Sequence, residues 1–321
     1  MGWGIYKMDL DEKIYVAGHK GMVGSAIVRQ LEKKGHSNII KKTSSLLDLR
    51  NQTKVNEFFQ QEKPETVILA AAKVGGIEAN MNDLTGFLLE NLQIQTNVLT
   101  AAYKNNVKKF MLLGSSCIYP KESIQPIKEE YLLTGPLEPT NEGYALAKIT
   151  GLKACEYYKK EYGLNYLSVI PTNLYGINDN FNPKTSHVIS SIIRRMHAAK
   201  ENNDPYVEIW GTGKPYREFM YVDDMAEATI FVLENYKGST SINIGTGKDI
   251  TIKKLAETIQ EVIEYEGKLT FNTSKPDGMF RKRLDVTKLK KMGWESKISL
   301  KEGLKKTYSW YLQNKKKIEK E

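Results

Sequence analysis

Short apolar runs alternate with longer amphipathic stretches through the first half of the chain. Each apolar run is a few residues long and lacks a polar face, which is typical of strands buried on both sides of a parallel sheet. The stretches between them place apolar residues at helical spacing. The predicted strands are 13–17, 38–40, 66–72, 109–113 and 166–170, and the predicted helices are 25–34, 52–63, 83–105 and 141–162. This alternation predicts an α/β fold, a Rossmann-type doubly wound parallel sheet with right-handed crossovers.

The pattern changes after Gly176, where the regular alternation stops. A polar loop, a helix and a strand are predicted next, at 178–184, 187–200 and 206–210. The strand 218–222 and the helix 223–235 are predicted to return to the main sheet, with Asp223 as the helix N-cap. Short helices and strands alternate again toward the C-terminus.

This change of pattern divides the chain into two predicted domains. The larger is a nucleotide-binding Rossmann domain, and the smaller is a mainly C-terminal α/β lobe that closes over it and binds substrate. The Rossmann domain is expected to contain residues 12–176 and 218–247, and the lobe residues 177–217 and 248–321.

The composition is that of a soluble globular protein, with 40% hydrophobic and 26% charged residues in a chain of 321. No stretch approaches the roughly 18 unbroken apolar residues of a membrane span. Residues 1–12 have no apolar core of the signal-peptide kind. We therefore expect a cytoplasmic protein without a membrane partner. With two cysteines, Cys117 and Cys155, and four histidines, neither a disulfide framework nor a metal site is expected.

The net charge of +9 raises the question of nucleic-acid binding. Most of the positive charge comes from scattered lysines, and the run Lys315–Lys317 lies in a predicted frayed tail. Anionic small molecules, such as dinucleotides and nucleotide sugars, explain the basic balance equally well. Nucleic acid is therefore not an expected partner.

A glycine-rich turn directly follows the first predicted strand and opens a helix. Strand, glycine turn and helix in this order are the context of a dinucleotide fingerprint, although the spacing is G-x-x-G-x-x-G and a simple tight turn is the alternative. Amides at the helix start, aided by its dipole, can hold a pyrophosphate. The candidate cofactor residues in the turn are Gly18, His19, Lys20, Gly21, Met22, Val23 and Gly24.

The loop after the second predicted strand bears on the choice between NAD and NADP. An NAD site carries an acidic residue about 20 residues past the glycines, to bind the ribose hydroxyls. This chain has Lys41, Lys42 and Ser44 there, with Lys20 inside the glycine turn, and these suit a 2′-phosphate. NADP is therefore favoured, with a solvated basic loop as the alternative. Asp48 lies later and is expected to meet the adenine.

Candidate acid–base groups gather where the strand 109–113 ends. In open parallel sheets ligands sit beyond the carboxyl ends of the strands. If the chain stays extended here, Ser115 and Cys117 face the same side. Tyr144 and Lys148 are four residues apart in a predicted helix and share one face. These groups suit acid–base chemistry beside a nicotinamide, whereas the alternatives are a small buried cysteine and a surface Tyr–Lys pair.

Several stretches beyond these motifs carry a resemblance to a known family: AAAKVGGIEAN, GSSCIYP, LEPTNEGYALAKI, PTNLYG, SHVI, WGTGKPYREFMYVDDMA and KPDG. The chain resembles the GDP-L-fucose synthases of the extended short-chain dehydrogenase/reductase superfamily over about residues 13–313. Gly-x-x-Gly-x-x-Gly and Tyr-x-x-x-Lys mark only the superfamily. The cysteine two residues past the serine, together with the later Ser-His-Val, is far more specific.

The resemblance implies epimerisation at C3 and C5 of GDP-4-keto-6-deoxy-D-mannose, followed by NADPH-dependent reduction at C4. Cys117 would be the epimerisation base and His187 the acid, since a nearby cation favours a thiolate and histidine titrates near neutrality. Tyr144 would donate the proton for reduction. Lys148 would stabilise the phenolate and hold the nicotinamide ribose, and Ser115 would stabilise charge on the C4 oxygen.

The resemblance also assigns binding residues. The further NADP(H)-binding candidates are Leu113, Gly114, Ser115, Ser116, Lys148, Pro171, Thr172, Asn173, Leu174 and His187. The GDP-sugar candidates are Arg195, Trp210, Arg217 and Asp277, with Arg281 and Lys282 as secondary ones. Arginines suit a diphosphate, whereas Trp210 is equally reasonable as a core residue.

A homodimer formed through the two long helices is also implied. Where some relatives carry arginines after the second strand, this chain has Ser44 and Ser45, which leaves the 2′-phosphate to Lys20, Lys41 or Lys42. Another nucleotide-sugar epimerase or dehydratase is the alternative enzyme, although Ser116 and Cys117 replace the acidic residues that dehydration needs. A non-catalytic dinucleotide sensor or RNA-binding relative is the alternative of a different class.

Overall fold

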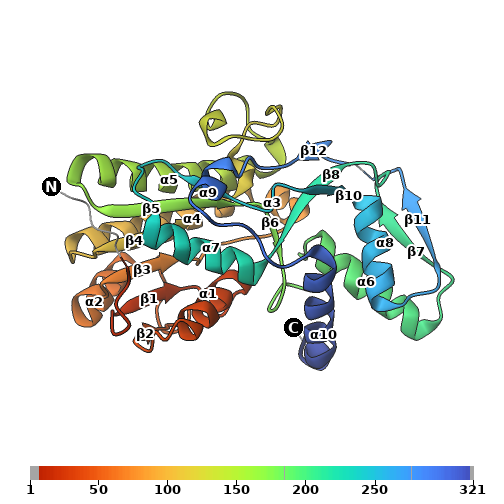
Figure 1. The fold of residues 1–321 in the computed structure, drawn as a ribbon, viewed down its shortest axis with the longest axis horizontal. Coiled ribbons are helices and arrows are strands. Elements are labelled where there is room, and N and C mark those ends of the chain that lie inside the picture. Colours follow the sequence, from red (N-terminus) through yellow and green to blue (C-terminus); the bar gives the residue numbers. More distant parts are fainter. Residues whose placement is uncertain (1–6, 184, 276, 319–321) are drawn as a thin grey trace.

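The computed structural model describes residues 7–183, 185–275 and 277–318. In this part of the chain a parallel sheet of six strands forms the centre of the larger region (Figure 1). Its strands are β1 (Ile14–Ala17), β2 (Ile39–Ile40), β3 (Thr66–Leu69), β4 (Lys109–Leu113), β5 (Asn165–Pro171) and β9 (Ile242–Ile244). Their order is β2-β1-β3-β4-β5-β9, and every pairing is parallel. The predicted Rossmann-type fold is confirmed. Because the order reverses between β1 and β3, the loops after these two strands flank the place where such sheets bind ligands.

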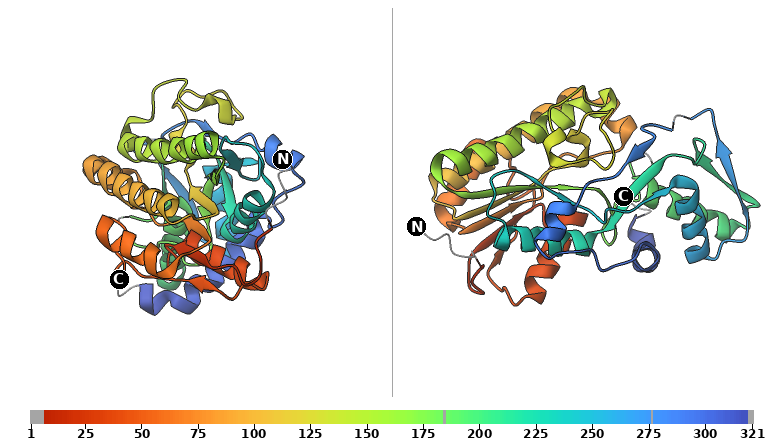
Figure 2. Two further views of the ribbon diagram at one scale, coloured as in Figure 1. Left: turned by 90° about the vertical axis from the view of Figure 1, so that its left-hand side faces the viewer. Right: turned by 45° about the horizontal axis from the view of Figure 1, so that its top comes forward.

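Helices cover both faces of this sheet. One face packs on α1 (Met22–Lys33) and α7 (Val222–Asn235), and the other on α2 (Gln52–Glu62), α4 (Leu84–Lys104) and α5 (Glu142–Tyr162). The two long helices α4 and α5 run side by side (Figure 2). The inward face of α1 is the predicted one, since Ala26, Ile27 and Leu31 are fully buried.

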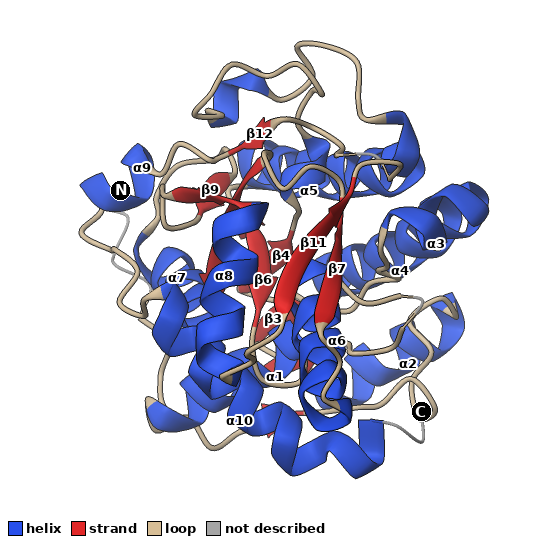
Figure 3. Ribbon diagram, turned by 90° about the vertical axis from the view of Figure 1, so that its right-hand side faces the viewer, coloured by secondary structure: helices blue, strands red, loops and turns tan. Residues whose placement is uncertain are grey.

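The second region lies at the other side of the molecule and has its own core (Figures 1 and 3). Its strands form a sheet of order β10-β8-β12 with β6 on β8, and a two-stranded sheet of β11 and β7. These strands are β6 (Asn173–Tyr175), β7 (Tyr206–Trp210), β8 (Tyr216–Tyr221), β10 (Asp249–Thr251), β11 (Lys268–Asn272) and β12 (Arg281–Lys282). The helices packed with them are α6 (Val188–Asn202), α8 (Ile252–Ile263) and α10 (Leu300–Ile318).

Short elements complete the described chain. The helix α3 (Ile77–Asn82) precedes α4, and α9 (Thr287–Lys291) precedes α10. Three single 3₁₀ turns, at Ser116–Ile118, Glu129–Tyr131 and Pro139–Asn141, lie between β4 and α5. Among the described residues no helix is both long enough and apolar enough to cross a membrane.

One strand prediction was wrong. The segment predicted at 218–222 does not rejoin the main sheet, because β8 pairs with β6, β10 and β12 in the second region. It is α7 that returns to the main sheet, and β9 then adds the last strand. The N-cap of α7 is Tyr221, and Asp223 lies in the first turn, where it forms an ion pair with Arg29 of α1 at 2.5 Å. The predicted two-domain division stays a prediction.

Other predicted boundaries also differ. The first helix begins at Met22 rather than at residue 25, because Gly21 is its N-cap. Strand β3 ends at Leu69, so the alanines that follow form a loop. Helix α6 begins at Val188, one residue after His187.

The N-terminal segment, to which the sequence assigns no role, is anchored in the fold from residue 7 onward. Glu12 and Lys109 form a buried ion pair at 2.7 Å, with 5% and 6% of their side chains exposed. The Thr66 hydroxyl also donates to Glu12. A buried pair of this kind is costly to break, since removal of one partner leaves a charge without compensation. The pair therefore ties the segment before β1 to the start of β4.

Candidate active site

The glycine turn after β1 packs directly against the loop after β3. Gly18 has a φ of +85°, and a Cβ there would lie 2.7 Å from the Ala71 nitrogen. A Cβ on Gly24 would lie 2.1 Å from the Gly18 carbonyl oxygen. The fold therefore requires glycine at both positions. Gly21 is different, because its Cβ would meet only the Gly18 oxygen, at an ordinary 3.5 Å.

The start of α1 fits a dinucleotide phosphate. The N-cap Gly21 provides no side-chain cap and the first turn has no acidic residue, so its amides are available. Among the described residues only the Gly18 oxygen, at 3.5 Å, lies near the Cβ position of Gly21, which leaves room for a ligand to approach the backbone. The buried His19 Nδ1 also has no hydrogen-bond partner. Burial, followed by the charges of Lys20 and Lys41, lowers the pKa of His19.

The lysines proposed for the 2′-phosphate differ in their partners. Lys41 contacts Glu32 and Lys42 contacts Glu62, both at 3.4 Å. Within the described ranges Lys20 has no ion pair, and it is exposed. Ser44 is exposed as well. Asp48 is held by Arg50 at 2.9 Å, and these hydrogen bonds lower the pKa of its carboxyl group.

The chain does not stay extended after β4. The Ser115 side chain accepts a hydrogen bond from the Cys117 amide at 3.3 Å and so caps a 3₁₀ turn over Ser116–Ile118. Ser115 itself is extended, but the chain turns from Ser116 onward, so the condition under which Ser115 and Cys117 would face the same side is not met. The turn is nevertheless fixed close to the sheet, because the Gly114 amide donates to the Val169 carbonyl of β5 at 2.8 Å and Ser116 is buried.

Tyr144 and Lys148 lie in the first turns of α5 and face the end of β4. The Lys148 ammonium, 5% exposed, donates to the Leu113 carbonyl at 2.8 Å and lies 5.7 Å from the centre of the Tyr144 ring. Burial lowers the pKa of Lys148 to about 8. The pKa of Tyr144 is raised by burial and by the charge of Cys117, while a hydrogen bond with Ser115 opposes the rise. Burial is the largest of these effects on Tyr144, and the role of Lys148 in stabilising its phenolate stays a prediction.

His187 occupies the N-cap position of α6, although its side chain makes no capping hydrogen bond. The imidazole is exposed, yet surrounding protein atoms desolvate it in part and lower its pKa. The preceding residues approach the loop after β3, since a Cβ on Gly76 would lie 3.6 Å from the Ser186 oxygen. Among the described residues no hydrogen bond joins His187 to Cys117 or Tyr144.

The residues proposed for the nicotinamide pocket are tied to the second region. Pro171 ends β5 of the main sheet, and Leu174 lies in β6, which pairs with β8 in the second region. The Thr172 hydroxyl and the Asn173 amide group both donate to the Glu218 carbonyl oxygen, at 3.2 and 2.9 Å.

The proposed nucleotide-sugar residues are partly assembled on the second region. Arg217 lies in β8, where burial lowers its pKa and the charge of Asp277 opposes that change. Asp277 accepts from the Thr212 amide and hydroxyl, each at 2.7 Å. Arg195 of α6 donates to the Glu208 carbonyl. Trp210 is 59% exposed and lies under the Lys275 ammonium at 5.1 Å, so the core alternative for this tryptophan was wrong.

One neighbour of Cys117 was not predicted. The Lys282 ammonium donates to the Cys117 sulfur at 3.7 Å. The sequence identified Lys282 only as a secondary substrate contact, because of its nearness to Asp277. No local signal relates it to Cys117, since the contact depends on the pairing of β12 with β8.

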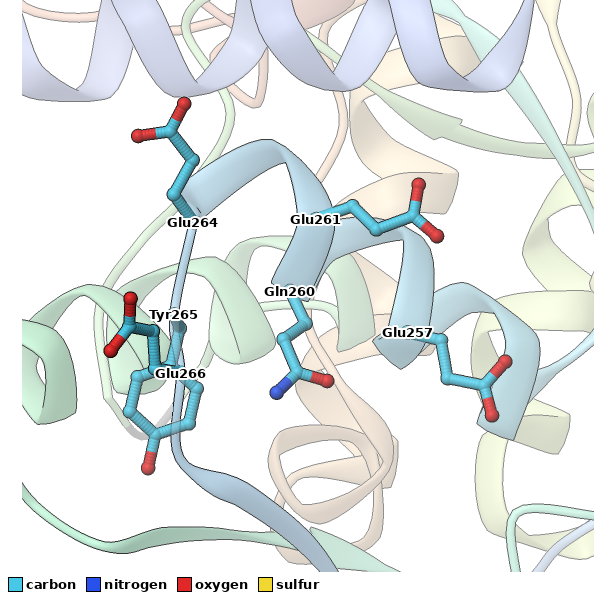
Figure 4. Close-up of a pocket in the computed structure, with 6 residues that line it drawn as sticks. All are labelled: Glu257, Gln260, Glu261, Glu264, Tyr265 and Glu266. Atoms are coloured by element: carbon cyan, nitrogen blue, oxygen red, sulfur yellow. The ribbon is translucent and has the colours of Figure 1, made fainter.

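A separate hollow of about 480 Å³ lies on α8 and the loop that follows it (Figure 4). Four glutamates are among its lining residues, and none of the predicted site residues is. The lining consists of Glu257, Gln260, Glu261, Glu264, Tyr265 and Glu266. These carboxylates would repel a diphosphate. The hollow is therefore not the candidate active site.

The chain is similar to several known proteins over nearly its whole length. A model of the NAD dependent epimerase/dehydratase family matches residues 14–245. The chain is 54% identical to GDP-L-fucose synthase 1 of Arabidopsis thaliana over 306 residues, 95% of each chain. It is 51% identical to the GDP-L-fucose synthase of Escherichia coli (strain K12), over 94% of this chain and 97% of the relative. A solved GDP-L-fucose synthetase from Naegleria fowleri bound to NADP superposes with a TM-score of 0.90 at 30% identity, covering 96% of this chain and 95% of that one.

Proposed function

Because the chain belongs to the NAD-dependent epimerase/dehydratase family, we propose that it converts GDP-4-keto-6-deoxy-D-mannose to GDP-L-fucose. The reaction is a 3,5-epimerisation followed by reduction of the 4-keto group, in one active site. The observation that carries the proposal is the meeting of Ser115, Cys117 and Tyr144 beyond the end of β4. Relatives named for this activity are about half identical to the chain over nearly its whole length, which supports the same conclusion.

The epimerisation needs a base and an acid on opposite faces of the sugar. The C4 ketone acidifies the hydrogens at C3 and C5, and we assign their removal to the Cys117 thiolate. The Lys282 ammonium supports this role, because it donates a hydrogen bond to the sulfur at 3.7 Å. His187, exposed at the start of α6, is assigned the return of a proton from the other face. Ser115 would stabilise the negative charge that develops on the C4 oxygen.

The reduction needs a proton donor next to the C4 oxygen. NADPH, when bound, would supply the hydride for C4. Tyr144 would give its phenolic proton to the oxygen; a tyrosine holds this proton at neutral pH, and the raised pKa of Tyr144 keeps it there. Lys148, fixed on the Leu113 carbonyl, would hold the nicotinamide ribose and stabilise the phenolate that remains.

NADP(H) is the cofactor that we propose for the site. Related reductases of known structure are described as bound to NADP, which supports it. The amides at the start of α1 would hold the pyrophosphate, and the residues 171–174 would line the nicotinamide. Of the three lysines proposed for the 2′-phosphate, Lys20 is favoured, because Lys41 and Lys42 already contact glutamates.

The GDP part is assigned to the second region. Arg195 and Arg217 would bind the diphosphate through bidentate hydrogen bonds, and the loss of solvent around both guanidinium groups strengthens such contacts. Trp210 presents an exposed aromatic face for stacking. Asp277 lies beside Arg217 and would orient it.

A homodimer through α4 and α5 is proposed as the assembly. These helices carry exposed apolar side chains, among them Leu89 at 49%, Leu146 at 42% and Tyr157 at 53%. Such side chains on neighbouring helices suit a helix-packed interface. In sedimentation the wild type should be a dimer and a Leu89→Glu/Leu146→Glu variant a monomer. Equal masses for the two proteins would contradict an interface through α4 and α5.

The function is tested by NADPH oxidation with GDP-4-keto-6-deoxy-D-mannose. We expect stoichiometric NADPH consumption and an NMR spectrum of GDP-L-fucose. A 4-epimerase would leave the NADPH concentration unchanged, and a reductase without epimerase activity would give a sugar that keeps its original C3 and C5 configuration. An RNA-binding relative would instead bind RNA with a steep dependence on salt.

A further inference from the structure

Glu218 is fully buried in β8 and belongs to none of the proposed catalytic or binding groups. Its carboxylate is an acceptor on which three backbone amides converge. Oε1 accepts from the Thr246 amide at 2.6 Å and the Gly247 amide at 2.8 Å, and Oε2 accepts from the Leu284 amide at 2.8 Å. Burial raises the pKa of this carboxyl, and the amide hydrogen bonds oppose the rise.

The same residue also holds the chain beside the proposed nicotinamide pocket. Its backbone oxygen accepts from the Thr172 hydroxyl at 3.2 Å and from the Asn173 side chain at 2.9 Å. The packing around the carboxylate leaves little space, since a Cβ on Gly245 would lie 2.2 Å from Oε1. Glu218 therefore joins three segments that are remote in sequence: 172–173, 246–247 and the chain at 284.

The chain at Leu284 also carries the lysine that contacts Cys117. Leu284 follows Lys282 by two residues, and the Lys282 ammonium lies 3.7 Å from the Cys117 sulfur. Lys282 is also opposite Arg217 in the pairing of β12 with β8. A displacement of the chain at Leu284 would therefore move Lys282 relative to Cys117.

We propose that Glu218 is a positioning residue, whose carboxylate keeps Lys282 against Cys117 without touching substrate. The inference rests on the proposed function. Only a carboxylate meets the requirement, because it offers two oxygens and no hydrogen. A glutamine in its place would keep one acceptor oxygen and turn an N–H donor toward one of the three amides, so that one segment would be released.

Glu218→Gln tests the proposal, and Glu129→Gln is the matched control. Glu129 is also a buried carboxylate near this edge of the sheet, where it accepts from the Asn243 amide at 3.1 Å and contacts Lys288 at 3.3 Å. Glu218→Asp keeps both acceptor oxygens, and it replaces Glu218→Gln as the test variant if Glu218→Gln does not fold. Each variant is compared with the wild type for the rate of Cys117 alkylation by iodoacetamide at neutral pH. Cys155, 1% exposed, remains protected in the folded protein.

In Glu218→Gln we expect slower alkylation, approaching the rate of a Lys282→Met reference, because the ammonium no longer lies at the sulfur. With the GDP-sugar we expect kcat for C3 hydrogen exchange to fall about ten- to a hundredfold, which is the scale of a displacement near 1 Å. The affinity for NADPH should change less than this. Glu218→Asp should lie between the wild type and Glu218→Gln, and Glu129→Gln should lower the melting temperature alone.

Wild-type alkylation and exchange rates in Glu218→Gln, or in Glu218→Asp if only that variant folds, would overturn the proposal, whatever the melting temperature. An equal loss of both rates in Glu129→Gln would also overturn it, because the effect would then come from general loosening of this edge. If the wild type does not turn over the GDP-sugar, the proposed function fails. The alkylation rates alone then decide whether Glu218 positions Lys282.

Discussion

The Lys282 ammonium lies 3.7 Å from the Cys117 sulfur, although 165 positions separate the two residues in the sequence. Cys117 comes from the turn after β4 of the main sheet, and Lys282 from β12 of the second region. The contact therefore crosses between the two regions. The ammonium donates a hydrogen bond to the sulfur that we assign as the base of the epimerisation.

Replacement of Lys282 is expected to impair the epimerisation more than NADPH binding. In Lys282→Met the side-chain length is kept and the charge is lost, so deuterium incorporation at C3 from heavy water should slow by about tenfold or more. Lys288→Met is the control, because Lys288 belongs to the same part of the chain but contacts Glu129. Mass spectrometry of the recovered sugar measures the incorporation. Equal rates in both variants and the wild type would remove Lys282 from the mechanism.

The two catalytic steps should separate in single variants. Cys117→Ser should abolish deuterium incorporation at C3, because a hydroxyl is a much weaker base than a thiolate, and should leave NADPH binding intact. Tyr144→Phe should keep the exchange and lower the reduction rate by about 10²–10⁴-fold, the usual contribution of a positioned proton donor. Exchange is followed by NMR and reduction by NADPH absorbance. Undiminished exchange in Cys117→Ser, or normal NADPH oxidation in Tyr144→Phe, would contradict the assigned roles.

The sequence predicted the main sheet because its strands are short apolar runs with clear ends. The strand 109–113 coincides with β4, and Lys148 does face the end of that strand, from the helix face that its four-residue spacing shares with Tyr144. The 3₁₀ turn over Ser116–Ile118 was missed because it depends on one side-chain cap, from Ser115.

Interactions between remote segments could not be predicted from local patterns. The apolar strand at 218–222 reads like another strand of the main sheet, and only tertiary packing places β8 in the second region. The contact of Lys282 with Cys117 and the hydrogen bonds of Glu218 follow from that placement. The sequence offered one signal for Glu218, a glutamate inside a largely apolar strand. If that strand is buried, the carboxylate needs several hydrogen-bond partners.

Two glycines of the cofactor turn should respond differently to alanine. Gly21→Ala should fold with a stability within about 1 kcal/mol of the wild type, since its Cβ meets only an ordinary contact at 3.5 Å. Its affinity for NADPH should fall at least about tenfold, because the methyl group enters the space proposed for the pyrophosphate.

Gly24→Ala should instead lower the free energy of unfolding by roughly 1–3 kcal/mol, because its Cβ would lie 2.1 Å from a backbone oxygen. Urea unfolding and fluorescence titration with NADPH measure the two effects. Wild-type NADPH affinity in Gly21→Ala would exclude the proposed phosphate position.

Lys20 should determine the preference for NADPH. Its exposed ammonium has no ion pair among the described residues, whereas the Lys42 ammonium contacts Glu62 at 3.4 Å. Lys20→Ala should weaken NADPH binding about tenfold, by the loss of a charge-assisted hydrogen bond, and leave NADH binding unchanged. Lys42→Ala is the matched variant in the same titrations, and a larger loss there would transfer the 2′-phosphate role to Lys42.

Asp179 lies in the loop between β6 and α6, where its carboxyl group is buried. The residue is 8% exposed, its Oδ1 accepts from the Asn180 amide at 2.7 Å, and the buried Oδ2 has no hydrogen-bond partner. Burial raises the pKa of Asp179 from 3.8 to about 7, although the hydrogen bonds from Asn180 and Ser190 oppose this rise. Above that pH the folded protein must keep a buried charge in this loop.

The effect of Asp179 on stability should therefore depend on pH. Between pH 3.8 and about 7 the native state holds a proton that the unfolded chain has released, so this group makes the protein less stable as the pH rises. Asp179→Asn removes the titration. At pH 8 the variant should be more stable than the wild type by on the order of 3 kcal/mol, and the difference should close as the pH falls toward 4. Urea unfolding of both proteins across this range measures it, and the contributions of other groups cancel in the difference. A difference that stays constant with pH would show that Asp179 is ionised in the folded state throughout.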